Sequence, residues 1–402
     1  MSKRHFSLFG LLLIFVLNGL GPVNAEKKEV VVLKALFDQK IATWTDVFSS
    51  EFLKAVPEKK IQEFVTLYQS KLGHLQEAID KKGKFDLLFS SGKAPCTISF
   101  NEHGLVKSLW LGNWTLFDDT PNKLADEWKK LPGVVSVTVT RNGSDTILDL
   151  NGNSPLGVGS AFKLFILKAY RQALASGTLR VDEILPLRSE WFSLPSGLLQ
   201  SWPAGTPITL ETYANLMISL SDNTATDHLL NRIGRANVEA VAPQRVRPFL
   251  GTMEMFRLKY GAAKYSGAFL KADEKGKREL LTRLASESIS VADISEKPVF
   301  INKIEWLIST AELCRVIYEL RKDPAIAINP GLVQKKAWAL CGYKGGSETG
   351  VLNYTLVLQK TPSSDIFCIS ATINDSEKSV DEETFTELFI RFLSLIETGK
   401  LG

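Results

Sequence analysis

Hydrophobic positions in the first quarter of the chain repeat first at helical spacing and then at strand spacing. From about Val30 to Ala78 they recur every three or four residues, in a run from Phe37 to Phe48 and, after a break at Pro57, in a run from Ile61 to Leu72. Apolar and polar residues then alternate in three segments: 85–89, 96–100 and 105–110. The pattern predicts helices followed by an antiparallel meander of strands.

A polar, proline-containing stretch from Asp118 to Asn122 interrupts this pattern and marks a candidate domain boundary. We predict a first domain over residues 26–118 and a second over residues 123–402. Because the stretch between them is polar and no catalytic motif precedes it, we expect the two domains to fold separately.

The second region mixes both periodicities. Helical patterns cover residues 124–131, 210–220, 224–233, 310–320 and 385–396, and strand patterns cover residues 134–140, 146–150, 337–343, 351–358 and 366–373. Thr209 and Thr310 are the expected N-caps of two of these helices, whereas residues 235–305 give no clear pattern. Helices bracketed by terminal strands predict an α+β fold built as an α/β sandwich, with an antiparallel sheet flanked by helices.

Residues 1–25 have the pattern of a secretory signal peptide. Lys3 and Arg4 form a basic start, Phe6 to Leu20 a mostly apolar core, and Val23-Asn24-Ala25 a small-residue cleavage site. The apolar core is too short to span a bilayer comfortably, and no later segment is apolar enough to cross one. We therefore expect a periplasmic or secreted protein without a permanent membrane span, the alternative being an uncleaved anchor.

Composition and charge exclude several classes of function. The chain has 402 residues and a formal net charge of +4, which comes closer to neutrality once the basic signal is removed, so nothing favours nucleic acid as a partner. The four histidines stand apart, and the four cysteines lack C-x-x-C spacing, so we expect no metal site and no cofactor. Disulfide pairing and oligomeric state stay open, and a small molecule is the expected substrate.

Ser160-Ala161-Phe162-Lys163 opens an apolar run that reads as a helix. Ser160 then lies in the first turn, with Lys163 three residues further on the same face. A hydroxyl at the positive end of a helix, beside an amine that can take its proton, is a candidate nucleophile. An isolated S-x-x-K is more often a capped helix with an ordinary lysine, so the assignment depends on the motifs that follow.

Two further motifs follow in order, Ser221-Asp222-Asn223 and Lys344-Gly345-Gly346. S-x-x-K, S-D-N and K-T-G in this order mark class A β-lactamases and penicillin-binding proteins. The chain from about Leu124 to its C-terminus resembles this serine β-lactamase and penicillin-binding superfamily. The resemblance implies a serine hydrolase that forms an acyl-enzyme on a small ester, amide or β-lactam.

The resemblance also implies catalytic roles for the matching residues. Ser160 is the expected nucleophile, Lys163 accepts or relays its proton, and Ser221 passes the proton to the leaving group. The backbone N–H groups of Ser160 and Ser347 are the expected oxyanion hole. Asp222 is expected to be structural.

Substrate binding is expected from Asn223, Lys344, Gly346 and Ser347. Asn223 would orient Lys163 and a substrate amide, and Lys344 would hold an anionic group. The family has Thr or Ser where this chain has Gly345, and that hydroxyl helps to hold a carboxylate. We therefore expect weakened carboxylate recognition and a preference for small neutral esters, unless a neighbouring hydroxyl such as that of Ser347 substitutes.

A second departure from the family concerns hydrolysis of the acyl-enzyme. Class A enzymes use a glutamate in an E-x-x-L-N stretch, and this chain has no such stretch between Asn223 and Lys344. The nearest candidate by spacing, Glu254, lies in a segment that reads as a helix start. We expect slow turnover of the acyl-enzyme, or activation of the water by Lys163 itself.

The first domain resembles, by its order of helices and strands, the cone-shaped nuclear-transport-factor-2-like domains. Such a domain before a β-lactamase-like domain is similar to the two-domain β-lactamase-like protein of clavulanic acid biosynthesis, which implies esterase-like chemistry. Three alternatives stay open: a β-lactam-acylated sensor or trap without efficient turnover, a DD-peptidase acting on peptidoglycan, and a catalytically silent scaffold.

Overall fold

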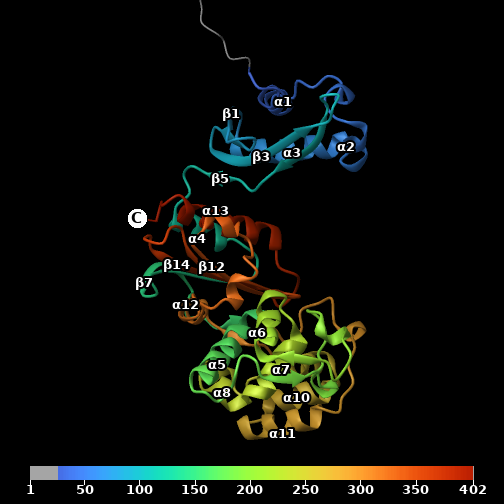
Figure 1. Ribbon diagram of the computed structural model, residues 1–402, viewed down its shortest axis with the longest axis vertical. Helices are drawn as coiled ribbons and strands as arrows, with labels where there is room; N and C mark the ends of the chain where they lie inside the picture. The colour runs from blue at the N-terminus through green and yellow to red at the C-terminus, as the bar shows by residue number, and fades with distance from the viewer. Residues whose placement is uncertain (1–25, 402) are drawn as a thin grey trace, which may run out of the picture. The chain divides into compact units, whose positions relative to one another are not determined.

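The computed structural model describes residues 26–401, which divide into two compact units, one ending at Asp118 and the other beginning at Asp119 (Figure 1). The signal peptide predicted at residues 1–25 lies outside the described residues. Across the described part of the chain, no helix combines the length and apolar character needed to cross a membrane. All four cysteines are buried and free.

The first unit packs helices against an antiparallel sheet. Its elements are α1 (Lys28–Phe37), α2 (Ser50–Ala55), α3 (Glu58–Leu72), β1 (Leu75–Asp80), β2 (Phe85–Phe89), β3 (Gly92–Phe100), β4 (Val106–Leu111) and β5 (Thr115–Leu116). The sheet has the order β1-β2-β3-β4, with β5 paired to β3. Helices followed by a meander therefore agree with the sequence pattern.

Two details of the first unit differ from the prediction. The expected helical run from Phe37 to Phe48 is wrong, because α1 ends at Phe37 and only a short 3₁₀ turn, Trp44–Asp46, follows. Phe48 is nevertheless buried and stacks on Trp44 and Phe52, so its apolar spacing reflects packing rather than a helix. Residues 75–78, expected to be helical, belong to strand β1.

The second unit contains two groups of elements. The strands are β6 (Val134–Arg141), β7 (Asp145–Leu150), β8 (Leu156–Gly157), β9 (Ile184–Pro186), β10 (Pro207–Thr209), β11 (Leu307–Ile308), β12 (Leu340–Glu348), β13 (Val351–Gln359) and β14 (Ile366–Asn374). The helices are α4 (Pro121–Trp128), α5 (Lys163–Ala175), α6 (Leu210–Ser219), α7 (Asn223–Ile233), α8 (Arg235–Glu239), α9 (Thr252–Tyr260), α10 (Ala263–Lys271), α11 (Glu274–Leu284), α12 (Thr310–Glu319) and α13 (Glu382–Glu397).

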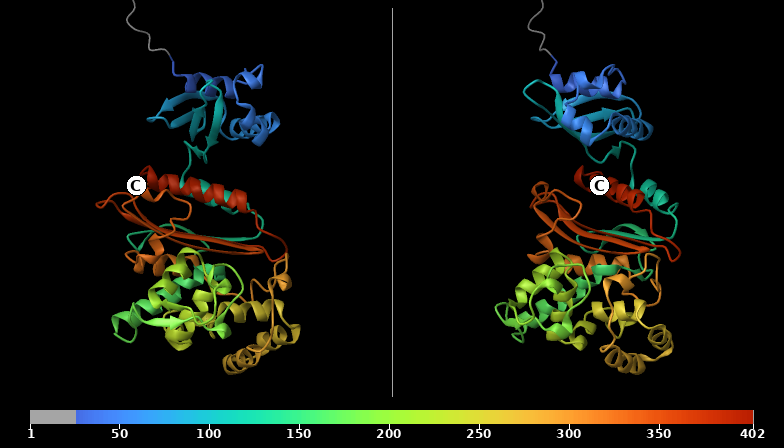
Figure 2. Two further views of the ribbon diagram at one scale, coloured as in Figure 1. Left: turned by 45° about the vertical axis from the view of Figure 1, so that its right-hand side comes forward. Right: turned by 90° about the vertical axis from the view of Figure 1, so that its right-hand side faces the viewer.

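An antiparallel sheet of order β12-β13-β14-β6-β7 divides this unit into two cores. Helices α4 and α13 pack on one face, where Trp128 stacks on Phe392. Helices α5, α6, α7 and α12 belong to the other core, with Val357 and Cys368 of the sheet. The two views in Figure 2 show helices on both faces of the sheet. The predicted α+β fold class, with an antiparallel sheet flanked by helices, is confirmed.

The second unit begins at Asp119, inside the stretch 118–122 that the sequence predicts to be a linker. Asp119 is buried and accepts hydrogen bonds from Arg391 of α13. Thr120 caps α4, which begins at Pro121, the favoured residue for the first helical position. Residues 119–122 are thus part of the second unit rather than a linker.

Most helix boundaries follow local capping signals. Thr209 caps α6 by accepting a hydrogen bond from the Thr212 N–H, and α7 ends at Gly234, as expected. The predicted cap Thr310 is wrong, because Ser309 accepts the hydrogen bond from the Glu312 N–H. Thr310 is instead buried, with its hydroxyl bonded to the hydroxyls of Ser136 and Thr138 on β6.

Candidate active site

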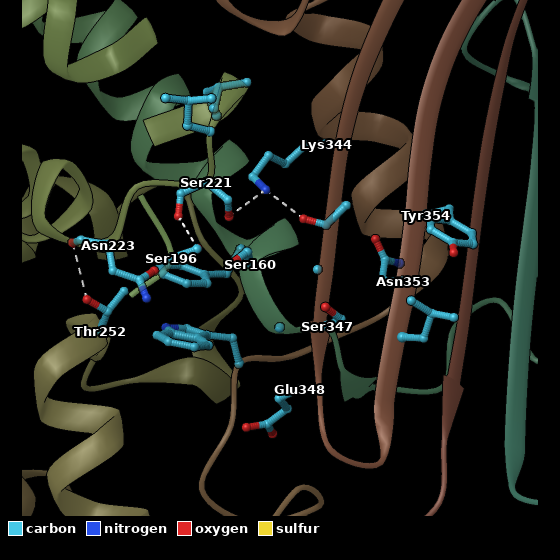
Figure 3. Close-up of a pocket in the computed structure, with 18 of the residues that line it drawn as sticks. Ser160, Ser196, Ser221, Asn223, Thr252, Lys344, Ser347, Glu348, Asn353 and Tyr354 are labelled. Atoms are coloured by element: carbon cyan, nitrogen blue, oxygen red, sulfur yellow. Dashed lines mark hydrogen bonds between the residues drawn. The ribbon is translucent and has the colours of Figure 1, made fainter. Parts of the chain in front are cut away.

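Six of the seven predicted site residues line one cleft of about 740 Å³ beside the edge strand β12 (Figure 3). They are Ser160, Ser221, Asn223, Lys344, Gly346 and Ser347. The seventh, Lys163, is completely buried. The three motifs, far apart in the sequence, are therefore brought together around one space.

Ser160 lies on a short 3₁₀ turn, Gly159–Phe162, that leads into α5 at Lys163. We predicted a continuous helix, and the structure instead begins the α-helix at the lysine. Gly159 has a φ of +48°, a left-handed conformation that favours glycine. The turn thus places a half-buried Ser160 at the wall of the cleft.

Gly346 is required by the close approach of this turn to strand β12. A Cβ atom at Gly346 would lie 2.7 Å from the Ala161 amide nitrogen and closer still to that of Ser160. A Cβ at Gly159 would likewise lie 2.8 Å from the Ser347 nitrogen. The amide nitrogens of Ser160 and Ser347 therefore lie on neighbouring backbones. The first N–H groups of a helical turn have no partner within it, which suits the Ser160 N–H to an oxyanion.

Lys163 is buried against neutral oxygen atoms. Its Nζ donates to the Ser221 carbonyl oxygen at 2.6 Å and to Asn223 Oδ1 at 2.7 Å, and it lies 3.2 Å from Ser221 Oγ. Burial lowers the pKa of Lys163 well below its usual value, and the charge of Lys344 lowers it further. The charges of Asp222 and Asp227 oppose this without reversing it. Burial thus favours the neutral amine, the form that can accept a proton.

Ser221 lies between the two lysines. Lys344 Nζ donates to Ser221 Oγ at 3.0 Å (Figure 3), and Lys163 Nζ lies 3.2 Å from the same oxygen. Ser221 adopts a φ of +56°, a conformation uncommon for a residue with a Cβ and often found at functional sites. Asn223 holds this arrangement by accepting from Lys163 and donating to the Leu194 carbonyl oxygen at 3.0 Å.

Lys344 is buried without a carboxylate contact. Its Nζ donates to Ser221 Oγ and, at 2.6 Å, to the Gly345 carbonyl oxygen. Burial lowers the pKa of Lys344 to about 7. Since an anion in the cleft would favour the charged form, this ammonium is a candidate anchor for an acidic group.

One expected contact is absent from the described residues. Ser160 Oγ makes no hydrogen bond to Lys163, to Ser221 or to any other described residue. Catalytic hydrogen bonds are often long or misaligned before substrate binds, so the contact is expected to form in the complex. The hydroxyl is accordingly free to meet a ligand.

Asp222 and Glu254 both have structural positions. Asp222 caps α7 by accepting from the Ala225 N–H, and it also accepts from the N–H groups of Leu198 and Leu199. Glu254 accepts from the Gly251 N–H in the first turn of α9 and pairs with Arg235. Glu254 does not line the cleft, in line with its interpretation as part of a helix start.

Sequence reasoning missed an acidic cluster at the cleft. Glu305 and Glu348 line the cleft and both contact Lys259, whose side chain is fully buried. Glu305 came from the stretch 235–305 that had no readable pattern. Glu348 follows the third motif by two residues, and only its position near that motif could have drawn attention to it.

The cluster holds one cation between two carboxyl groups. Burial alone would lower the pKa of Lys259, but the charges of Glu305 and Glu348 outweigh it and raise that pKa. Burial and the charge of Glu305 raise the pKa of Glu348 to about 8, although Lys259 opposes the shift. Glu305 Oε1 is buried and has no hydrogen-bond partner among the described residues.

Comparison with known proteins gives a family for one segment of the chain. Residues 120–256 match the sequence model of the β-lactamase enzyme family. That part of the chain is similar to β-lactamases. The segment includes the first two motifs and ends before Lys344. No curated protein matches the chain.

Several solved structures resemble the chain at low sequence identity. A β-lactamase from Sphaerobacter thermophilus is 18% identical with a TM-score of 0.48, covering 69% of this chain and 97% of its own. A PBP-A mutant in an acyl-enzyme complex with penicillin G is 17% identical with a TM-score of 0.42, covering 69% and 95%. A β-lactamase from Francisella tularensis is 14% identical with a TM-score of 0.47, covering 70% and 99%.

The family match supports the β-lactamase part of the resemblance only. It confirms a β-lactamase-like segment in the second unit, as the first two motifs predicted. Nothing in these comparisons bears on the resemblance of residues 26–118 to nuclear-transport-factor-2-like domains, or on the similarity to the clavulanic acid protein. Both stay predictions.

Proposed function

We propose that this chain is an exported serine hydrolase that forms an acyl intermediate on Ser160 with a small ester, amide or β-lactam. The observation that carries the proposal is the state of Lys163, a buried amine that contacts only neutral oxygens and lies one turn from a cleft serine. A neutral amine in this position is the base that a serine nucleophile needs.

Acylation follows from the positions of four groups. Ser160 Oγ attacks the carbonyl carbon of the substrate, and its proton passes to Lys163 Nζ. The electron pair of the carbonyl moves to its oxygen, which accepts hydrogen bonds from the Ser160 and Ser347 N–H groups. When the intermediate collapses, the bond to the leaving group breaks. Ser221 Oγ delivers its proton to the leaving group and takes in return the proton that Lys163 Nζ received from Ser160.

A mass measurement with a matched control tests the nucleophile. We expect the intact protein to gain the mass of a phenyl fluorophosphonate fragment on Ser160 and Ser160→Ala to gain none. Ser219→Ala is the control, because Ser219 also lines the cleft but donates to the Asn215 carbonyl oxygen. Equal labelling of wild type and Ser160→Ala would overturn the proposal.

The position of Glu254 favours a second candidate function, a trap that a β-lactam acylates without efficient turnover. Glu254 is the glutamate whose distance along the chain from the second motif fits best. Its carboxylate instead pairs with Arg235 and accepts a hydrogen bond from the Gly251 N–H at the start of α9. With no glutamate at that place to activate water, the acyl-enzyme should hydrolyse slowly. After mixing with penicillin G, an adduct that persists for hours would favour the trap, and one that disappears as product accumulates would favour the hydrolase.

Export is part of the proposal and rests on the sequence of residues 1–25 alone. Cleavage after Ala25 predicts a mature protein that begins at Glu26 and is found in the periplasm or the medium. N-terminal sequencing of the fractionated protein tests this. An intact Met1 terminus in the membrane fraction would contradict it in favour of an uncleaved anchor.

A further inference from the structure

The proposed reaction gives strand β12 a leaving-group end and an acyl end. Lys344, Gly346 and Glu348 are alternate residues of the strand and share one face. Gly346 packs against the backbone of Ser160, and Lys344 contacts Ser221, the proposed proton donor to the leaving group. Glu348 lies beyond Gly346 in the other direction, on the opposite side of Ser160 from Lys344 (Figure 3). The acyl group of a substrate held at Ser160 therefore extends toward Glu348.

The acyl end of the cleft has more carboxyl groups than cations. Glu305 and Glu348 both line the cleft, and Lys259 is the only cation of the described residues that pairs with either of them. The Glu305 side chain is completely buried, and its Oε1 has no hydrogen-bond partner in this part of the chain. The Glu348 side chain keeps 15% of its surface exposed. The cluster can thus pair with one more positive charge, which a ligand in the cleft can supply.

Glu348 is mostly protonated at pH 7 when the cleft holds no cation. Burial and the charge of Glu305 raise its pKa to about 8, although Lys259 opposes the shift. An ammonium group beside the carboxyl group favours the ionised form, so the ligand replaces the proton. This exchange costs about tenfold in affinity at pH 7 and only about twofold at pH 8.

Apolar side chains line the cleft together with these acids. Met255 and Phe256 belong to α9, the helix that carries Lys259, and Trp306 follows Glu305 in the chain. Their carbon surface suits the body of an aryl or alkyl acyl group, and the faces of aromatic rings also attract ammonium groups. An acyl group that combines an apolar body with an ammonium group therefore matches this end of the cleft.

We propose that Glu348, together with Glu305, selects substrates that carry an ammonium group on the acyl side. This inference rests on the proposed function and names its substrate class: esters, amides or β-lactams of amino-substituted acyl groups. It concerns the acyl side alone. The expectation of weak carboxylate recognition on the leaving-group side is unchanged.

A pair of aryl esters tests the inference at pH 8. Phenyl 4-(aminomethyl)phenylacetate and phenyl 4-ethylphenylacetate have acyl groups of the same shape, but the first ends in an ammonium group and the second in a methyl group. We expect wild type to have the higher kcat/KM on the ammonium ester. Glu348→Gln keeps the shape of the protonated carboxyl group. It should lose about ten- to a hundredfold on the ammonium ester, the usual worth of a hydrogen bond to a charged group, and little on the ethyl ester.

Two further variants separate direct contact from the general charge of the cleft. Glu305→Gln should also lower the ratio of the two esters, because Lys259 then neutralises the one carboxylate that is left. Glu382→Gln is the matched control, because Glu382 lines the same cleft as the first residue of α13 and pairs with no cation of the described residues. We expect its ratio to stay at the wild-type value. A fall as large as that in Glu348→Gln would overturn the inference.

The outcomes distinguish this inference from the proposed function. If Glu348→Gln lowers kcat/KM equally on both esters, or on neither, Glu348 does not select the ammonium group and the inference fails. If wild type hydrolyses neither ester and Ser160 is not labelled, the proposed function fails. Calorimetric binding of benzylamine then still decides the inference, which requires weaker binding to Glu348→Gln than to wild type, and equal binding would contradict it.

Discussion

Two lysines of the second unit are equally buried but have opposite electrostatic surroundings. Lys163 and Lys259 both have fully buried side chains. Lys163 contacts a carbonyl, an amide and a hydroxyl oxygen, and its pKa is lowered. Lys259 contacts two carboxyl groups, and its pKa is raised.

The difference shows that burial alone does not make a lysine catalytic. Removing an ammonium from water favours the neutral amine unless a carboxylate compensates it. Around Lys259 the compensation is present, and the lysine stabilises two acids. Lys163 donates no hydrogen bond to a carboxylate of the described residues, and its lowered pKa is what the proposed base beside Ser160 requires.

The largest expected effect is on activity, from Lys163→Met. If Lys163 is the base, kcat/KM on a neutral aryl ester should fall about a hundred- to ten-thousandfold. The free energy of unfolding should fall less than in a variant that breaks a buried ion pair, because Lys163→Met leaves two neutral oxygen acceptors without a donor but no charge without its partner. Steady-state kinetics and urea unfolding give the two values. Near-normal activity would mean that the proton leaves Ser160 by another route.

Lys259→Met should lower the free energy of unfolding. Lys259→Met leaves Glu305 and Glu348 buried without their cation, and breaking a buried ion pair costs about 3–5 kcal/mol. Urea unfolding at pH 7 measures this loss. Lys163→Met is the control, because it replaces a buried lysine that has no carboxylate contact. Equal losses of unfolding free energy in the two variants would contradict the electrostatic difference between the two lysines.

The smallest effect is a pH dependence carried by Glu348. Its folded-state pKa, raised to about 8, exceeds the ordinary value of 4.5, so the folded state binds more protons between these values. The contribution of Glu348 to stability is therefore fully present below about pH 4.5 and is lost as pH rises through 8. Glu348→Gln cannot titrate, so we expect its advantage over wild type to grow by at most about 1.4 kcal/mol per pH unit in this window.

Urea unfolding of wild type and Glu348→Gln at pH 5, 6, 7 and 8 measures that slope. Glu397→Gln is the control, because Glu397 is half-exposed and pairs with Lys360 at the surface. A constant difference between Glu348→Gln and wild type at all four pH values would show that Glu348 is ionised throughout.

The candidate site was predictable where its signal is local. Ser160 with Lys163, and Ser221 with Asn223, are short motifs whose spacing already implies a shared face or turn. The sequence also shows Gly159 and Gly346, but it does not show which backbone segments these glycines allow to approach each other. The family match later covered the same two motifs.

The rest depends on contacts between distant segments. Lys259 of α9 contacts Glu348 of β12 and Glu305 of the segment before β11. No pattern within one segment indicates that these three residues meet. Thr310 is a residue type that favours helix caps, but its buried hydroxyl bonds to Ser136 on β6. Ser309 therefore caps α12 by accepting from the Glu312 N–H.

The pH dependence of Ser160 labelling tests the central claim, a lowered pKa of Lys163, most directly. The rate of reaction with a neutral phenyl fluorophosphonate is followed by intact mass between pH 6 and 9. Because burial lowers the pKa of Lys163, we expect the rate to level off within this range rather than to rise throughout it. A lysine with the usual pKa of 10.5 would instead give a rate that rises about tenfold per pH unit, roughly a thousandfold in all, and that result would contradict the account.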